Sequence, residues 1–277
     1  MKYDSPVAFR NALEARLKAQ QTDAVGLSRL HKRIVFERLL ARIQAVTPDR
    51  WVLKGGFALE LRLGLQARTT KDVDVDWTVD ESAVTEFLLD AADHDLDDHF
   101  TFTIERLSTD LAGGGQRWTV LAELAGREFE RVAIDIGHDR PPVIAPDSIA
   151  TSQLLEFAGV APISVPALAI EQHLAEKFHA YSRCYAGNAP SSRVKDLVDI
   201  AVVTQATPID GDLLLEAVDS IVGRRATHDV PHRLPPPLRD WARPWERLSR
   251  TSLRQATWTM VSKKQMHSEA QCSLIRS

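Results

Sequence analysis

Residues 72–76 carry the clearest pattern of polar and apolar positions in the chain, a strict alternation of aspartate and valine. A period of two is typical of a β-strand, whose successive side chains point to opposite faces. The strand therefore places Asp72, Asp74 and Asp76 on one face and its two valines on the other. Three carboxylates in a row repel one another unless a cation or solvent screens them.

An apolar run and two glycines precede this strand. Residues 51–53 predict a short strand that ends at Lys54-Gly55-Gly56, and apolar residues between positions 57 and 65 indicate a short helix after it. The backbone amides of a glycine pair at the start of a helix can approach a phosphate, although glycine pairs also occur in simple turns.

The rest of the chain divides by the same criteria. Helical spacing indicates helices over residues 4–20, 23–46, 81–92, 165–181 and 210–224, and alternation indicates strands over residues 100–106, 117–123 and 128–136. Residues 113–115 predict a hairpin turn. The proline-rich residues 141–166 are typical of a connection, so we expect one domain over residues 1–150 and another over residues 151–277.

Two charged segments are interpreted as solvated surface. The acidic residues 93–98 lack the frame of a calcium-binding loop. The polar side of the helix at residues 23–46 is basic and could contact nucleic acid, but we favour a solvated helix face. Its basic residues are Arg29, His31, Lys32, Arg33, Arg38 and Arg42.

Composition indicates an ordinary soluble protein. The 277 residues are 44% hydrophobic and 26% charged, and no apolar run approaches the roughly 20 residues that span a bilayer. The charged N-terminal segment does not resemble a signal peptide. Cys184 and Cys272 form neither a disulfide framework nor a zinc motif, so we expect a cytoplasmic protein without a membrane partner.

The net charge of −4 does not indicate nucleic-acid binding, but its distribution is uneven. Residues 224–264 carry ten Lys and Arg against three Asp and Glu, a net charge of +7. Such a stretch can attract a phosphate backbone or can simply be solvated. Trp241, Trp245 and Trp258 lie in the same stretch; they could stack on bases, but we favour packing against the helical domain.

Two interpretations of the acidic strand remain. It could be a charged edge strand that resists aggregation, or a site for a divalent cation such as Mg²⁺, which carboxylate oxygens suit. The glycine pair upstream favours the second interpretation. Asp135 stands between two isoleucines at the end of a later strand, where an unpaired buried carboxylate is costly and where the residue could cap the following turn.

The stretch from residue 54 to residue 74 resembles the AbiEii/MenT family of nucleotidyltransferase toxins, relatives of the DNA polymerase beta-type fold. The matching blocks are Lys54-Gly55-Gly56-Phe57-Ala58-Leu59 and Arg68-Thr69-Thr70-Lys71-Asp72-Val73-Asp74. The chain departs from the family at Phe57, where relatives often have Ser or Thr, so a hydroxyl that could touch phosphate is missing there.

The second half of the chain resembles two further family blocks. They are Glu171-x-x-Leu174-Ala175-Glu176-Lys177 and Arg193-Val194-Lys195-Asp196-Leu197-Val198-Asp199-Ile200. Taken alone, Lys177 is typical of a solvent-exposed helix residue, and Asp196 suits the helix dipole. The resemblance implies instead that Lys177 binds the triphosphate as a mobile point charge, that Asp199 holds Lys177 in place, and that Asp196 pairs with a neighbouring arginine.

The resemblance also implies a fold and a reaction. The fold is α/β (α+β), a mixed sheet with flanking helices followed by a mainly helical domain that completes the active site. The reaction is transfer of a nucleoside monophosphate from a nucleoside triphosphate, with two Mg²⁺ ions bound by Asp72, Asp74 and Asp135. The catalytic residues are Asp72, Asp74, Lys177 and Asp199, and the nucleotide-binding residues are Lys54, Gly55, Gly56, Thr70, Lys71 and Lys177.

The biological role implied is that of a toxin in a toxin–antitoxin pair, acting on an RNA acceptor, the tRNA 3′ end, and so blocking translation and growth. Thr70 matches a position where family members have a serine that an antitoxin partner can modify. Two alternatives stay open. The protein could modify an antibiotic or metabolite with the same site, or it could be a nucleotide-binding or partner-binding module without catalysis.

Overall fold

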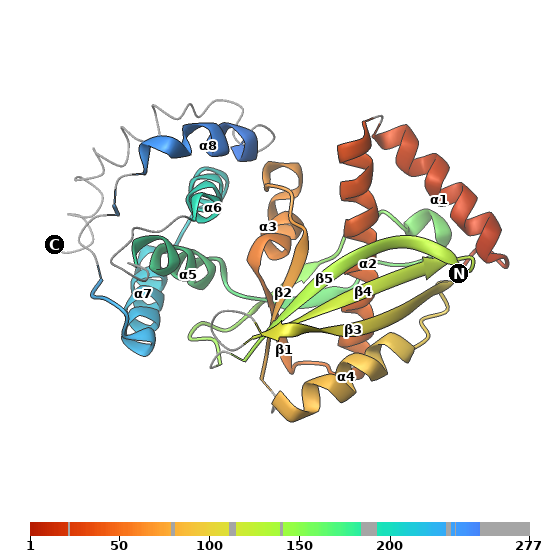
Figure 1. Cartoon of the computed structure of the whole chain (residues 1–277), viewed down its shortest axis with the longest axis horizontal. Coiled ribbons are helices and arrows are strands. Elements are labelled where there is room, and N and C mark those ends of the chain that lie inside the picture. Colours follow the sequence, from red (N-terminus) through yellow and green to blue (C-terminus); the bar gives the residue numbers. More distant parts are fainter. Residues whose placement is uncertain are drawn as a thin grey trace. The chain divides into compact units, whose positions relative to one another are not determined.

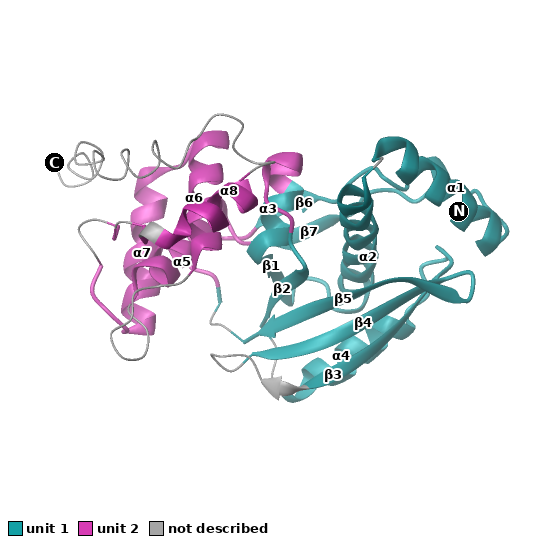
Figure 2. Cartoon of the chain, turned by 45° about the horizontal axis from the view of Figure 1, so that its top comes forward, with its two compact units in different colours: residues 1–61, 70–141, 147–167 teal, residues 62–69, 142–146, 168–277 magenta. Residues whose placement is uncertain are grey.

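The structure, a computed structural model, describes residues 1–21, 23–78, 81–110, 115–138, 141–183, 193–230, 234–235 and 237–249. The chain forms two compact units (Figure 2). Unit 1 comprises Met1–Leu61, Thr70–Pro141 and Asp147–Ala167, and unit 2 comprises Arg62–Thr69, Pro142–Pro146 and Leu168–Ser277. Within the described ranges, no helix has both the length and the apolar character needed to cross a lipid bilayer.

The mixed sheet that the family resemblance implied forms the centre of unit 1, and it has seven strands. The strands are β1 (Trp51–Lys54), β2 (Asp72–Trp77), β3 (Phe100–Asp110), β4 (Gln116–Leu124), β5 (Arg127–Gly137), β6 (Asp147–Ala150) and β7 (Ser164–Ala167). Their order is β3-β4-β5-β2-β1-β7-β6. The β2–β5 and β1–β7 pairs are parallel and the others are antiparallel. In Figure 1, β3, β4 and β5 run side by side with α4 along β3.

The helices of unit 1 bury the apolar side of this sheet. They are α1 (Pro6–Gln20), α2 (Ala24–Val46), α4 (Glu81–Asp93), the short η2 (Glu156–Ala158) and most of α3 (Gly55–Leu63), which η1 (Gly64–Gln66) follows. Asp23 caps α2 by accepting a hydrogen bond from the Gly26 amide. Val73 and Val75 are fully buried in the core, so the apolar half of the Asp-Val alternation fixes which face of β2 points inward.

The expectation that Arg38, Arg42 and residues 93–98 are solvated was wrong for three of these side chains. Asp98 is fully buried and accepts hydrogen bonds from both nitrogens of the Arg42 fork, at 2.8 and 2.9 Å, and from Arg38 Nε at 2.6 Å. Burial alone would raise the pKa of Asp98, but the two guanidinium groups outweigh it and hold this pKa below its usual value. The cluster is an internal ion-pair network that joins α2 to the start of β3.

Residues 141–166 are more than the expected connection, since they contain β6, η2 and most of β7. Ser164–Ala167 pairs with β1 through Leu53 and Ala167, so the following helix begins at Ile170 and not at residue 165. Unit 1 accordingly extends to Ala167, beyond the expected boundary at residue 150. Of the predicted hairpin turn, Gly113 and Gly114 lie outside the described residues.

Unit 2 is mainly helical. Its helices are α5 (Ile170–Ser182), α6 (Val194–Ala206), α7 (Gly211–Arg225) and α8 (Ala242–Ser249), with the short η4 (Arg239–Trp241) before α8. Helices α6 and α7 both pack against α5. Trp241 contacts Tyr181 edge to face, at 5.9 Å between ring centroids, and Trp245 is buried, which confirms that these tryptophans pack. Trp258 and both cysteines lie outside the described residues.

Candidate active site

Three aspartates lie on neighbouring positions of two parallel strands. Asp74 on β2 is the register partner of Asp135 on β5, and Asp72 is the partner of Ala133. Partners in a parallel pair point to the same face of the sheet, so the Asp72, Asp74 and Asp135 side chains share one face. The Asp72 side chain is 35% exposed and that of Asp135 is 12% exposed. This face is opposite to the one buried by Val73 and Val75.

Arg117 on β4 binds two of these carboxylates. Its Nε and Nη2 donate to the two oxygens of Asp135, each at 2.6 Å, and Nη2 also donates to Asp72 Oδ2 at 3.2 Å. Hydrogen bonding to Asp135 raises the pKa of Arg117 above its usual value, against a smaller opposing effect of burial. Sequence reasoning missed this residue, although Arg117 and Asp135 occupy the same level of the β4–β5 hairpin.

The glycine pair forms the first two residues of α3, directly after β1. Gly55 has φ of +68°, and a β-carbon placed on it would lie only 1.9 Å from Asp74 Oδ2. The chain needs glycine here both for the backbone conformation and for the close approach of the carboxylate. Phe57 is fully buried against Phe36, at 4.9 Å between ring centroids, so the residue that replaces the family hydroxyl faces the core.

Lys54 and Asp76 form an ion pair beside Gly137. A β-carbon on Gly137 would lie 2.2 Å from Asp76 Oδ1 and 3.2 Å from Lys54 Nζ. The pair therefore occupies the space that a side chain at position 137 would fill. Asp76, the third residue of the acidic row, is buried here and serves as a partner for Lys54.

Thr70 and Lys71 lie at the start of β2. Thr70 is buried, and its hydroxyl is placed to donate to the backbone carbonyl of Asp72 at 3.1 Å or to Asp72 Oδ1 at 3.2 Å. Lys71 is exposed. The threonine hydroxyl thus orients Asp72 from one side, while Arg117 binds its other oxygen.

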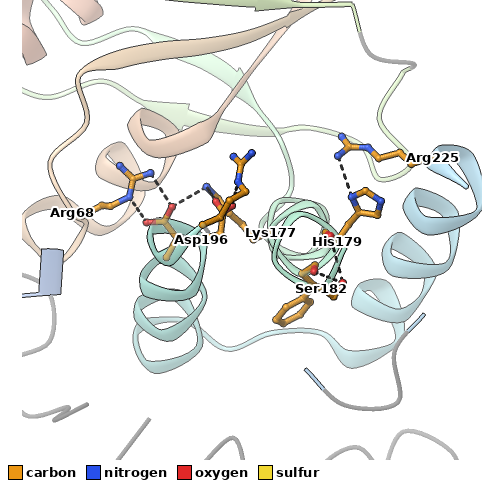
Figure 3. A network of polar contacts seen from close by, with 9 residues as sticks. Arg68, Lys177, His179, Ser182, Asp196 and Arg225 are labelled. Atoms are coloured by element: carbon orange, nitrogen blue, oxygen red, sulfur yellow. Dashed lines mark hydrogen bonds and ion pairs between the residues drawn. The ribbon is translucent and has the colours of Figure 1, made fainter. Parts of the chain in front are cut away.

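A second charged cluster lies within unit 2 (Figure 3). Arg68 Nε and Nη2 donate to the two carboxylate oxygens of Asp199, at 2.9 and 3.0 Å. Lys177 on α5 lies 2.8 Å from Asp199 Oδ2 and 3.0 Å from Asp196 Oδ1. Asp196 also accepts a 2.5 Å hydrogen bond from Arg193. The predicted Lys177–Asp199 and Asp196–arginine contacts are both present, and Arg68 is a further partner that sequence reasoning did not assign.

Burial and charge act in opposite directions within this cluster. Burial alone would lower the pKa of Lys177, but Asp199 and Asp196 outweigh it and raise this pKa above its usual value. Burial alone would raise the pKa of Asp199, but Lys177 and Arg68 outweigh it and lower this pKa. The amine and the carboxylate are therefore both charged at neutral pH.

The donor chemistry of the three aspartates fits the divalent cation that the family resemblance implies. Carboxylate oxygens are hard ligands that suit Mg²⁺, and all three are on one face of the sheet. Within the described ranges, however, no three His, Cys, Asp or Glu side chains are gathered closely enough to hold a metal ion. The guanidinium of Arg117 takes up both oxygens of Asp135 and one of Asp72.

Comparison with known proteins gives the class of the molecule. Residues 38–268 match the family model described as "Nucleotidyl transferase AbiEii toxin, Type IV TA system". The match covers most of the chain, so the protein is a nucleotidyltransferase. It belongs to the AbiEii family of toxins from type IV toxin–antitoxin systems.

Several solved structures are similar to this chain. The nucleotidyltransferase toxin MenT4, Rv2826c from Mycobacterium tuberculosis H37Rv, is similar with a TM-score of 0.59 and 20% identity, over 96% of this chain and 99% of that one. JHP933 from Helicobacter pylori matches with a TM-score of 0.48 and 16% identity over 88% and 91% of the two chains. A putative nucleotidyltransferase from H. pylori gives 0.48 and 17% over 88% and 92%. No curated protein matches by sequence.

Proposed function

We propose that this toxin transfers a nucleoside monophosphate from a nucleoside triphosphate to an RNA acceptor, the 3′ end of tRNA, and thereby stops translation and growth. The observation that carries the proposal is the in-register pair of Asp74 and Asp135, with Asp72 two residues away on the same face, in a chain of the AbiEii family. An RNA with a blocked 3′ end cannot be aminoacylated. We place the reaction in the cytoplasm, where triphosphates and tRNA are found.

Asp72, Asp74 and Asp135 would hold Mg²⁺, in a two-metal arrangement. When bound, the metal supplies an activated hydroxyl nucleophile and neutralises the leaving pyrophosphate. Thr70 keeps one oxygen of Asp72 oriented, and Gly55 lets the carboxylate of Asp74 lie directly against the start of α3. These contacts fix two of the ligands before any substrate binds.

The nucleotide is bound by groups near the glycine pair and by Lys177. The amides of Gly55 and Gly56 open α3 and favour a phosphate oxygen, with Lys54 and Lys71 as flanking cations. Lys177, held by Asp199, adds positive charge where it develops in the transition state. Arg68, which binds Asp199, belongs to the same family-matched block as Asp72 and Asp74.

The RNA acceptor is favoured over a small molecule by the positive stretch at residues 224–264. The test is to incubate the purified protein with labelled triphosphates, Mg²⁺ and either total tRNA or a metabolite pool. Label in tRNA that is lost in Asp74→Asn supports the proposal. Label only in a small molecule would establish the rival antibiotic- or metabolite-modifying enzyme. Sequencing of tRNA 3′ ends after expression in bacteria would identify the added nucleotide.

A non-catalytic module is the remaining alternative. Such a module would need nucleotide or partner binding but not the three carboxylates. Expression of Asp72→Ala in bacteria discriminates the two, because a catalytic toxin loses growth inhibition while a binding module keeps it. Asp93→Asn, which changes an exposed carboxylate on α4, is the matched control and should still inhibit growth.

We also propose that an antitoxin partner neutralises the enzyme through Thr70. A phosphoryl group there would add charge beside Asp72, displace the hydrogen bond that orients it and repel the triphosphate. The burial of Thr70 means that the start of β2 must open for modification. Coexpression with the antitoxin is the test: Thr70→Ala should escape neutralisation. A Thr70→Ala toxin that remained fully neutralised would argue against this site of control.

A further inference from the structure

Arg117, on β4, bridges two carboxylates of the face that carries Asp72, Asp74 and Asp135. Its fork uses both oxygens of Asp135, and the same nitrogen that reaches Asp135 Oδ2 also reaches Asp72. These are two of the three carboxylates that would hold the metal.

We propose that Arg117 is a latch on the metal site: its guanidinium and a divalent cation bind the same carboxylate oxygens and exclude each other. This inference rests on the proposed function of the three aspartates as metal ligands. The guanidinium must release Asp135 before that carboxylate can bind a metal. Arg117 therefore sets the Mg²⁺ concentration that the enzyme needs.

Competition follows from charge and geometry. Both bonds from Arg117 to Asp135 are 2.6 Å long, so each oxygen of this carboxylate already accepts a charge-assisted hydrogen bond. A second cation at the same oxygens would face the guanidinium at short range, where like charges repel. The guanidinium also stabilises the site when no metal is bound. Without Arg117, its positive charge would no longer offset the repulsion between the carboxylates of Asp72 and Asp135.

The latch is placed so that it can open. The Arg117 side chain is 36% exposed, whereas Asp135 is 12% exposed. Arg117 enters from β4, the strand next to Asp135, and its stem has several rotatable bonds, so the guanidinium can turn away while the sheet stays intact. The buried fork of Arg42 on Asp98, in which both side chains are 1% exposed, has no comparable freedom.

The experiment measures metal binding by the purified protein without nucleotide or RNA. Mn²⁺ binding is followed by electron paramagnetic resonance and Mg²⁺ binding by calorimetry, for wild type, Arg117→Met and Arg117→Lys. Arg117→Met keeps the apolar stem and removes the charge, and we expect it to bind Mn²⁺ about tenfold more tightly. Arg117→Lys keeps the charge without the fork and should fall between. Arg131→Met, at an exposed arginine of β5, is the matched control and should equal wild type.

A second readout is thermal stability. Without metal, Arg117→Met should melt below wild type, and saturating Mn²⁺ should raise its melting temperature by more than it raises that of wild type. Folding of each variant is checked by circular dichroism, and Arg117→Lys stands in if Arg117→Met does not fold. Equal or weaker metal binding by both folded Arg117 variants would overturn the latch.

The outcomes also separate the latch from the proposed function. Metal binding by wild type that is lost in Asp74→Asn, without tightening in either Arg117 variant, would leave the metal site standing and refute the latch. No metal binding by wild type or by either Arg117 variant would refute both. Nucleotidyl transfer measured on the same samples then tests the reaction independently of the binding result.

Discussion

The carboxylate of Asp74 occupies the position that a β-carbon on Gly55 would take, since that carbon would lie 1.9 Å from Asp74 Oδ2. The glycine of the Lys-Gly-Gly motif is therefore a space requirement of the acidic site as well as a backbone requirement. Gly64 also has a positive φ, but a β-carbon placed on it would meet no atom within 4 Å. Gly55 thus meets both a backbone requirement and a space requirement, whereas Gly64 meets the backbone requirement alone.

We expect Gly55→Ala to abolish nucleotidyl transfer and Gly64→Ala to preserve it. Both substitutions carry the strain of positive φ, of order 1 kcal/mol, but only the first displaces Asp74. The measurement is label incorporation into tRNA, with urea unfolding of both variants. Similar activity losses in the two variants would show that backbone strain, and not the Asp74 contact, limits the enzyme.

Asp74→Asn and Asp135→Asn should each lower transfer by about 10²-fold or more while leaving the fold intact. Residues that hold one group act as a unit, so the double variant should lose little more than either single variant. Turnover with labelled triphosphate is the readout, with Asp93→Asn as control. Independent, multiplying losses would mean that the two aspartates do not share a ligand.

Removal of the buried Asp98 should be far more costly than removal of an exposed acid. Asp98→Ala leaves Arg42 and Arg38 without their shared carboxylate inside the protein, so we expect a loss of about 3–5 kcal/mol in unfolding free energy. Glu128→Ala breaks an exposed pair with Arg131 and should cost at most about 1 kcal/mol. Urea unfolding compares them, and equal costs would contradict the ion-pair network.

Between the end of α5 and the end of α7, a chain of hydrogen bonds depends on neutral histidines (Figure 3). Arg225 can only donate, so His179 Nδ1 accepts at 3.4 Å and His179 Nε2 donates to Thr227 at 2.9 Å. The Thr227 hydroxyl then donates to His228 Nδ1, and His228 Nε2 donates to Ser182 Oγ. Ser182 is left to donate to a backbone carbonyl of α5. A proton added to either ring would break this order.

Acid should therefore weaken this contact in unit 2. Burial, together with Arg225, His228 and Arg183, lowers the pKa of His179 to about 4 from its ordinary 6.5. The unfolded chain takes up the proton near pH 6.5 and the folded chain resists it until about pH 4, so stability falls as the pH drops between these values. Melting temperatures from pH 7 to 4 should fall less steeply in His179→Gln. Parallel curves for wild type and variant would exclude this histidine as the cause.

The sequence predicted strands correctly where the alternation of polar and apolar residues within one segment was sufficient. The Asp-Val alternation of β2 and the apolar alternation of β4 and β5 gave the correct strands, because period-two patterning reports which face is buried. The family-matched blocks led to Asp72 and Asp74 and to the contact of Lys177 with Asp199. Asp135 was found from its position at the end of an apolar strand, and the sheet places it on the same face as Asp72 and Asp74. Their chemical roles remain predictions.

What could not be read depends on partners far apart in the sequence. Nothing near Arg42 indicates burial, since its partner Asp98 arrives 56 residues later. The four-residue β7 contains a proline and is recognisable only through its pairing with β1. Arg117 was missed because its importance comes from two carboxylates on two other strands. A rule that checks the cross-strand neighbour of each candidate aspartate would have found it.

The alternation in β2 has a consequence for how such a gene can change. Deleting or inserting one residue within the strand would turn the aspartates into the apolar interior and the valines outward, so the domain would fail to fold instead of folding with a damaged site. Loss or gain of a single codon in this strand is therefore expected to remove the folded protein altogether. Inactive but folded toxins should arise by point substitution of single aspartates.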